Sequence, residues 1–129
     1  MNYRITGTGS CIPDITKKNS DFLKNKFLDR DGSDIQSSNP EIIEKFKSIT
    51  GITERKYASD EINCSDLATD AAKNAIVDSK IDQETIDYII VAHNAGDISC
   101  NSGQVDTLPS IASKVKAKWI LCNRSVTIE

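Results

Sequence analysis

The strongest constraint on the fold is a short apolar segment, Ile86–Ala92, in which Asp87 is the only charged residue. A run this short and this rich in β-branched residues predicts a strand buried on both faces. Before it, a segment that begins at Ser65 carries apolar residues at helical spacing, and we expect the Ser65 hydroxyl to cap that helix. Its apolar positions are Leu67, Ala68, Ala71, Ala72, Ala75 and Ile76. The alanines predict close approach to a neighbouring element, as in a helix packed on a sheet.

The N-terminal third alternates between ordered elements and polar connections. Residues Tyr3–Thr6 alternate apolar and polar side chains and predict a strand that runs into the glycine turn Gly7–Ser10. A short helix is expected over Asn19–Lys26, and the polar stretch Asp29–Pro40 reads as a long loop.

Two further helices are marked by their terminal residues. Asn39 and Pro40 suit the start of a helix that ends at Gly51. Pro109-Ser110 begins the last helix, whose apolar positions are Ile111, Ala112, Val115 and Ala117. The order of strand, helix, strand and helix predicts an α/β fold.

Composition excludes several classes of function. Hydrophobic residues make up 38% and charged residues 27% of the 129, which is typical of a globular domain and not of a disordered chain. The net charge of −3, without a basic stripe, argues against nucleic-acid binding. No apolar run approaches the roughly 20 residues that span a membrane, and no secretory signal is apparent, so we expect a cytoplasmic protein. The four cysteines form no zinc pattern and are expected to be free thiols, buried as small apolar residues.

His93 and Asn94 follow the predicted buried strand and are the weak candidates for substrate binding. A loop at the carboxyl end of a strand is where α/β sheets place ligands, and an imidazole there can act as a base. A role in ordering the loop is the alternative. Asp97, Cys100 and Asp106 could join His93 around a metal, but their spacing matches no ligand pattern, so no metal site is predicted. Gly7–Ser10 lacks the third glycine of a dinucleotide loop, and a tight turn is the simpler reading.

Four segments in order resemble the β-ketoacyl-(acyl carrier protein) synthases III of the thiolase superfamily. They are Ile5–Pro13 (ITGTGSCIP), Thr50–Tyr57 (TGITERKY), the helix from Ser65 with the strand and loop that follow it through Asn94, and Leu108–Ser113 (LPSIAS). The resemblance covers residues 1–118 and implies an incomplete α/β fold, the N-terminal portion of a thiolase-like protein. Residues 119–129 do not resemble the family, and a frameshift or premature stop is our hypothesis for them.

The resemblance also implies a chemistry. In this family an acyl group passes from coenzyme A to an active-site cysteine, and malonyl-acyl carrier protein is then decarboxylated to give the carbanion that attacks the thioester. A histidine and an asparagine from the second half of the fold assist. Coenzyme A thioester is a substrate, no resident cofactor is implied, and acyl-CoA and acyl carrier protein are the partners. The family usually forms dimers.

None of the three catalytic residues can be carried over to this chain. Counting from Pro109 places the nucleophile past Glu129, Cys122 has surroundings unlike those of the family's cysteine, and His93 belongs to the first half of the fold. Lys45 and Ile49 replace the tryptophan and arginine that hold the adenine of coenzyme A in the best-known members. Activity of this chain alone is therefore not expected.

Two other functions remain open at this point. The chain could be a non-catalytic interaction module that pairs with a full-length synthase. It could instead be an unrelated small α/β ligand-binding domain that uses the Gly7–Ser10 turn and the His93 loop.

Overall fold

The computed structural model describes residues 3–99, 103–119 and 127–128, and divides the chain into two compact units. One unit comprises residues 14–57, and the other comprises residues 1–13 together with 58–129. The first is built on an antiparallel pair, β1 (Ile15–Lys18) and β2 (Glu54–Tyr57), with Ile15 opposite Tyr57. It also holds the short 3₁₀ helix η1 (Asn19–Phe22) and helix α1 (Asn39–Thr50).

Helix α1 confirms the predicted stop and corrects the predicted start. Gly51 ends the helix in the left-handed conformation, with φ of 68°. The cap is Ser38 rather than Asn39: the Ser38 amide and hydroxyl both donate to the Glu41 carboxylate, each at 2.9 Å. The side-chain amide of Asn39 instead donates to the backbone carbonyls of Leu23 and Asn25, and these hydrogen bonds connect the preceding loop to the helix.

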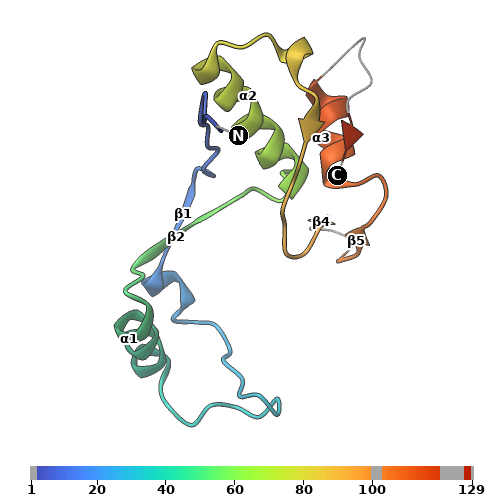
Figure 1. Cartoon of the computed structure of the whole chain (residues 1–129). Coiled ribbons are helices and arrows are strands. Elements are labelled where there is room, and N and C mark those ends of the chain that lie inside the picture. Colours follow the sequence, from blue (N-terminus) through green and yellow to red (C-terminus); the bar gives the residue numbers. More distant parts are fainter. Residues whose placement is uncertain (1–2, 100–102, 120–126, 129) are drawn as a thin grey trace. The chain divides into compact units, whose positions relative to one another are not determined.

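The second unit contains the remaining elements. They are α2 (Cys64–Ser79), the 3₁₀ helix η2 (Gln83–Thr85), β3 (Tyr88–Ile89), β4 (Asp97–Ile98), β5 (Val105–Asp106), α3 (Ile111–Trp119) and β6 (Thr127–Ile128). Helices α2 and α3 lie against each other (Figure 1). Strand β4 pairs antiparallel with β5, and β3 pairs in parallel with β6. None of the helices described is long and apolar enough to cross a membrane.

The core of this unit lies between the two helices. Ile111, Ala112 and Val115 of α3 are buried, as predicted, while Ala117 is exposed. The predicted apolar face of α2 is half-buried. Its two fully buried positions are polar, Ser65 and Thr69, and the Thr69 hydroxyl donates to the Ser65 carbonyl at 2.7 Å.

The N-terminal segment differs from the prediction. Residues 3–6 form no strand, and Gly7–Ser10 is neither a tight turn nor a phosphate loop. The segment lies along α2, where the Thr8 amide donates to Asp78 and the Asn74 side chain donates to the Ser10 carbonyl, both at 2.9 Å. A Cβ atom on Gly9 would collide with the backbone of α2 at Ala71 and Ala75. The glycines and the alanines of α2 therefore allow one close contact between two backbones.

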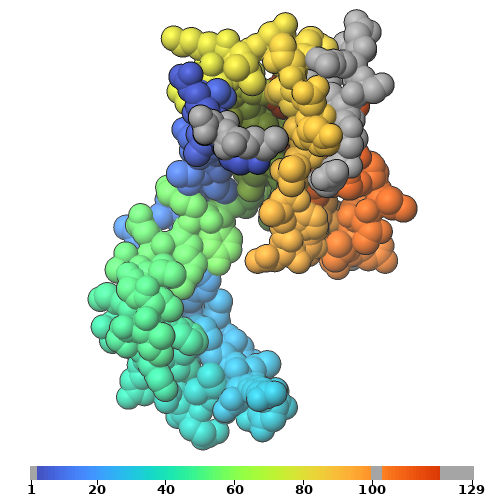
Figure 2. Space-filling view, in the orientation of Figure 1, coloured from blue at the N-terminus to red at the C-terminus, as the bar shows by residue number. Residues whose placement is uncertain are grey.

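The prediction of a strand buried on both faces is only partly confirmed. The apolar run does contain a strand, β3, but Tyr88 is 59% and Ile90 73% exposed. Among the described residues β3 pairs only with the two residues of β6, and so narrow a sheet cannot bury both faces. Figure 2 shows the gold segment that contains β3 at the surface in this view.

Candidate functional site

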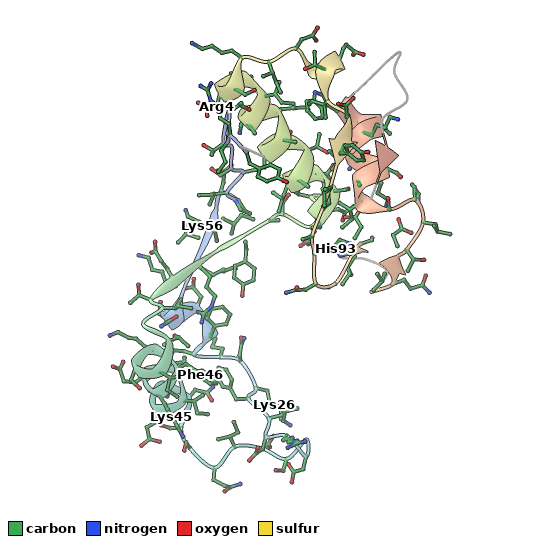
Figure 3. The ribbon with its side chains drawn as sticks, in the orientation of Figure 1. Arg4, Lys26, Lys45, Phe46, Lys56 and His93 are labelled. Carbon is green, nitrogen blue, oxygen red and sulfur yellow. The ribbon has the colours of Figure 1, made fainter. Side chains whose placement is uncertain are left out.

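A hollow of about 230 Å³ lies beside the loop that connects β3 to β4. His93 lies in this loop (Figure 3). The hollow is lined by His93, Asn94, Ala95, Gly96, Val105, Asp106, Thr107, Ser110 and Ile111. The structure thus brings both predicted candidates, His93 and Asn94, to one concave surface together with the start of α3.

The conformation of the loop determines which tautomer His93 adopts. The Gly96 amide donates to Nδ1 of His93 at 2.9 Å, so the proton of the neutral imidazole lies on Nε2. Gly96 has φ of 78°, which favours glycine. The ring is exposed and can present its Nε2–H to a ligand. Ser110, which lines the hollow at the start of α3, is already hydrogen-bonded to Ser113 at 3.0 Å.

Directly after this loop, a buried carboxylate anchors the chain. Asp97 is 3% exposed and accepts from the Ser65 amide at 2.9 Å and from the Lys114 ammonium at 3.0 Å. Lys114 also donates to Asp106 at 2.8 Å. One lysine of α3 therefore holds both strands of the β4–β5 pair, while Asp97 connects β4 to the first turn of α2.

The electrostatics of this cluster favour the charged forms. Burial opposes ionisation of Asp97, but the hydrogen bonds from Ser65 and Lys114 outweigh it and lower the pKa of Asp97. The hydrogen bonds to Asp106 and Asp97 raise the pKa of Lys114. The Asp97 carboxylate and the Lys114 ammonium thus stay ionised at neutral pH.

A second lysine of α3 completes the cluster and corrects the predicted role of Ser65. Lys118 donates to the Ser65 hydroxyl at 2.8 Å and to Asp66. Helix α2 is capped instead by Asn63, whose amide donates to Asp66 at 2.9 Å. The hydrogen bond from Lys118, followed by that from Asn63, lowers the pKa of Asp66.

Sequence reasoning did not find Lys114 and Lys118 as partners. Their spacing of four residues on α3 places them on one face of the helix, one turn apart. That spacing was the only available signal, because their partners, Ser65, Asp66 and Asp97, lie far away in the sequence.

The same geometry argues against Asp97 and Asp106 as metal ligands. Asp97 and Asp106 do converge, but on the Lys114 ammonium, which already neutralises them. Among the described residues no group of three or more metal-ligating side chains exists, and Cys100 lies outside them. Cys11 and Cys64 are free thiols, but Cys11 is half-buried and Cys64 exposed, contrary to the buried positions predicted. Cys122 also lies outside the described residues.

The unit of residues 14–57 has a separate, apolar hollow of about 190 Å³. It is lined by Asn19, Phe22, Phe27, Ile43, Phe46, Arg55 and Tyr57. Phe27, which lies just before the polar stretch Asp29–Pro40, and Phe46 of α1 (Figure 3) have ring centroids 6.1 Å apart. Lys45 and Ile49, which replace the family's adenine-holding residues, are exposed on the same helix.

Comparison with known proteins relates the chain to condensing enzymes. No family model matches it. It is 38% identical over 112 residues to β-ketoacyl-[acyl-carrier-protein] synthase III 2 of Vibrio cholerae, covering 87% of this chain and 25% of the relative. It is 34% identical over 118 residues to synthase III 1 of Vibrio vulnificus, covering 92% and 31%. The crystal structure of 3-oxoacyl-[acyl-carrier-protein] synthase III from Aquifex aeolicus matches with a TM-score of 0.68 and 25% identity, covering 99% of this chain and 34% of that one.

These matches define the structural class of the protein. The chain has the mixed α/β fold of the thiolase-like proteins and represents only part of that fold. It belongs to the β-ketoacyl-[acyl-carrier-protein] synthase III family, and it spans about a quarter to a third of the length of the relatives it matches.

Proposed function

We propose that these 129 residues serve as the N-terminal part of a 3-oxoacyl-(acyl carrier protein) synthase III. The reaction of such an enzyme joins an acyl-CoA to malonyl-acyl carrier protein, and the products are 3-oxoacyl-acyl carrier protein, coenzyme A and carbon dioxide. The observation that carries the proposal is the identity of 38% over 112 residues to a synthase III, in a chain with the matching fold.

The 129 residues alone do not catalyse condensation in this proposal. The family's cysteine nucleophile, histidine and asparagine have no counterpart among them. The exposed His93 is occupied at Nδ1 by the Gly96 amide and has no activated thiol beside it in the described part of the chain. Covalent catalysis needs a nucleophile and a base within hydrogen-bond reach of each other.

The chain contributes to the reaction by forming one side of the path in which the substrate binds. The hollow beside the β3–β4 loop offers the Nε2–H of His93, the Asn94 side chain and the hydroxyl of Thr107 to a polar ligand. Such convergent polar groups in a concave surface suit the amide-rich arm of a coenzyme A thioester.

The test is a titration of the full chain with acetyl-CoA, followed by NMR. His93 is the only histidine, so its imidazole signals are assigned without further work. We expect those signals to shift with saturation, while the same titration of an Asn94→Ala variant gives a weaker response. Signals of His93 that stay unchanged at millimolar acetyl-CoA would remove the loop from the substrate path.

A second role, pairing with a complementary thiolase-like chain, is favoured by the exposed face of β3. Tyr88 of β3 and Ile90, directly after the strand, expose large apolar side chains, and β3 has only β6 beside it among the described residues. Apolar surface of this kind marks an interaction site. Co-purification of the tagged chain with a full-length synthase III would support pairing, and a Tyr88→Lys/Ile90→Lys variant should abolish it.

A further inference from the structure

We infer that Lys114 is the positioning residue of the His93–Gly96 loop, holding it through Asp97 so that the imidazole keeps a single tautomer at the edge of the hollow. The inference concerns the loop assigned above to the substrate path. It rests on contacts within one unit of the chain and does not depend on which ligand the loop meets.

The chain of contacts is continuous. Asp97 follows Gly96 directly, and its buried carboxylate is held from two sides, by the Ser65 amide and by Lys114. The loop is therefore fixed at its carboxyl end to both helices. One residue before that anchor, the Gly96 amide donates to Nδ1 of His93, which lies four residues before Asp97.

Lys114 also determines how β5 faces the loop. Its bond to Asp106 holds β5 against β4, and Val105 lies close to the Cα of Gly96. The lysine side chain is only 15% exposed, while that of Asp106 is 69% exposed. Without the ammonium, the buried Asp97 carboxylate would keep only its contacts with Ser65 and would lose its charged partner, and such groups move toward water or toward a new partner.

The neighbouring lysine provides a matched control. Lys118 lies one turn further along α3 and contacts Ser65 and Asp66 at the start of α2. Among the residues that the structure describes, Lys118 forms no hydrogen bond or ion pair with the loop or with the β4–β5 pair. Loss of Lys118 should therefore disturb the helix contact while leaving the loop in place.

The experiment compares Lys114→Met, Lys114→Arg and Lys118→Met in the full chain. Nitrogen NMR at a pH where imidazole is neutral gives the tautomer of His93, and hydrogen exchange gives the protection of the Gly96 amide. We expect the wild type, Lys114→Arg and Lys118→Met to keep the proton on Nε2. Lys114→Met should give a mixture of tautomers and an exchange of the Gly96 amide that is about tenfold faster or more.

A folded Lys114→Met chain with the wild-type tautomer and wild-type exchange would overturn the inference. If Lys114→Met does not fold, Asp106→Ala decides, because it removes an exposed carboxylate and frees one side of the same lysine. It should accelerate exchange of the Gly96 amide, and an unchanged rate would count against Lys114. The acetyl-CoA titration is independent: a loop that depends on Lys114 but ignores acetyl-CoA refutes the proposed substrate path alone.

Discussion

At the scale of single residues, Asp97 links the stability of the fold to pH. Its pKa is lowered in the folded chain relative to the unfolded value of about 3.9, so its ionised form stabilises the fold above that pH. This contribution is lost as the pH falls through the folded pKa. We predict that the urea midpoint decreases between pH 6 and pH 3, and that Asp97→Asn, which costs about 2 kcal/mol at pH 7, shows a smaller decrease. Equal acid dependence of both chains would contradict the assignment.

Gly9 tests the close contact between the N-terminal segment and α2. An added methyl group would meet the backbone of α2 at Ala71 and Ala75, which cannot yield as a flexible side chain would. We predict that Gly9→Ala lowers the free energy of unfolding by roughly 1–3 kcal/mol and removes the exchange protection of the Thr8 amide. Thr8→Ala, which keeps the amide and changes only an exposed side chain, is the control and should retain that protection.

At the scale of elements, the two longest helices end in the same backbone conformation on different residues. Gly51 follows α1 with φ of 68°, whereas Lys80 follows α2 with φ of 56°. A side chain in this region is strained by about 1 kcal/mol. We predict that Lys80→Gly raises and Gly51→Ala lowers the free energy of unfolding, each by about 1 kcal/mol. Chemical denaturation of the full chain measures both, and a loss of stability in Lys80→Gly would contradict the prediction.

The elements that could be predicted from the sequence are those fixed by local chemistry. Gly51 stops α1 and Pro109-Ser110 precedes α3, because glycine and capping residues act on their own helix ends. The role of Ser65 was predicted wrongly, since its hydroxyl is bonded by Lys118, which is distant in the sequence. The role of His93 and Asn94 in substrate binding stays a prediction made from their place after a strand. Lys114 could not be predicted, because its two carboxylates become neighbours only in the folded chain.

At the scale of the whole molecule, the apolar run Ile86–Ala92 explains why prediction and structure differ in burial. Its composition is that of a strand inside a wide sheet, while Tyr88 of β3 and the following Ile90 are exposed. The chain spans about a third of a synthase III structure. The residues of this run suit a strand in the complete sheet, but only part of that sheet is present here, so the run is left exposed. We predict concentration-dependent association of the chain in sedimentation velocity, reduced by Ile90→Lys. A monomer at every concentration would contradict it.

The central claim is that this chain is the N-terminal part of a condensing enzyme, and fragment complementation tests it most directly. The chain is mixed with the remaining part of the Vibrio cholerae synthase III 2, and 3-oxoacyl-acyl carrier protein is measured from acetyl-CoA and malonyl-acyl carrier protein. The relative's own N-terminal fragment is the positive control. We predict product with either N-terminal fragment and none with any fragment alone. Product with the relative's fragment but none with this chain would contradict the claim.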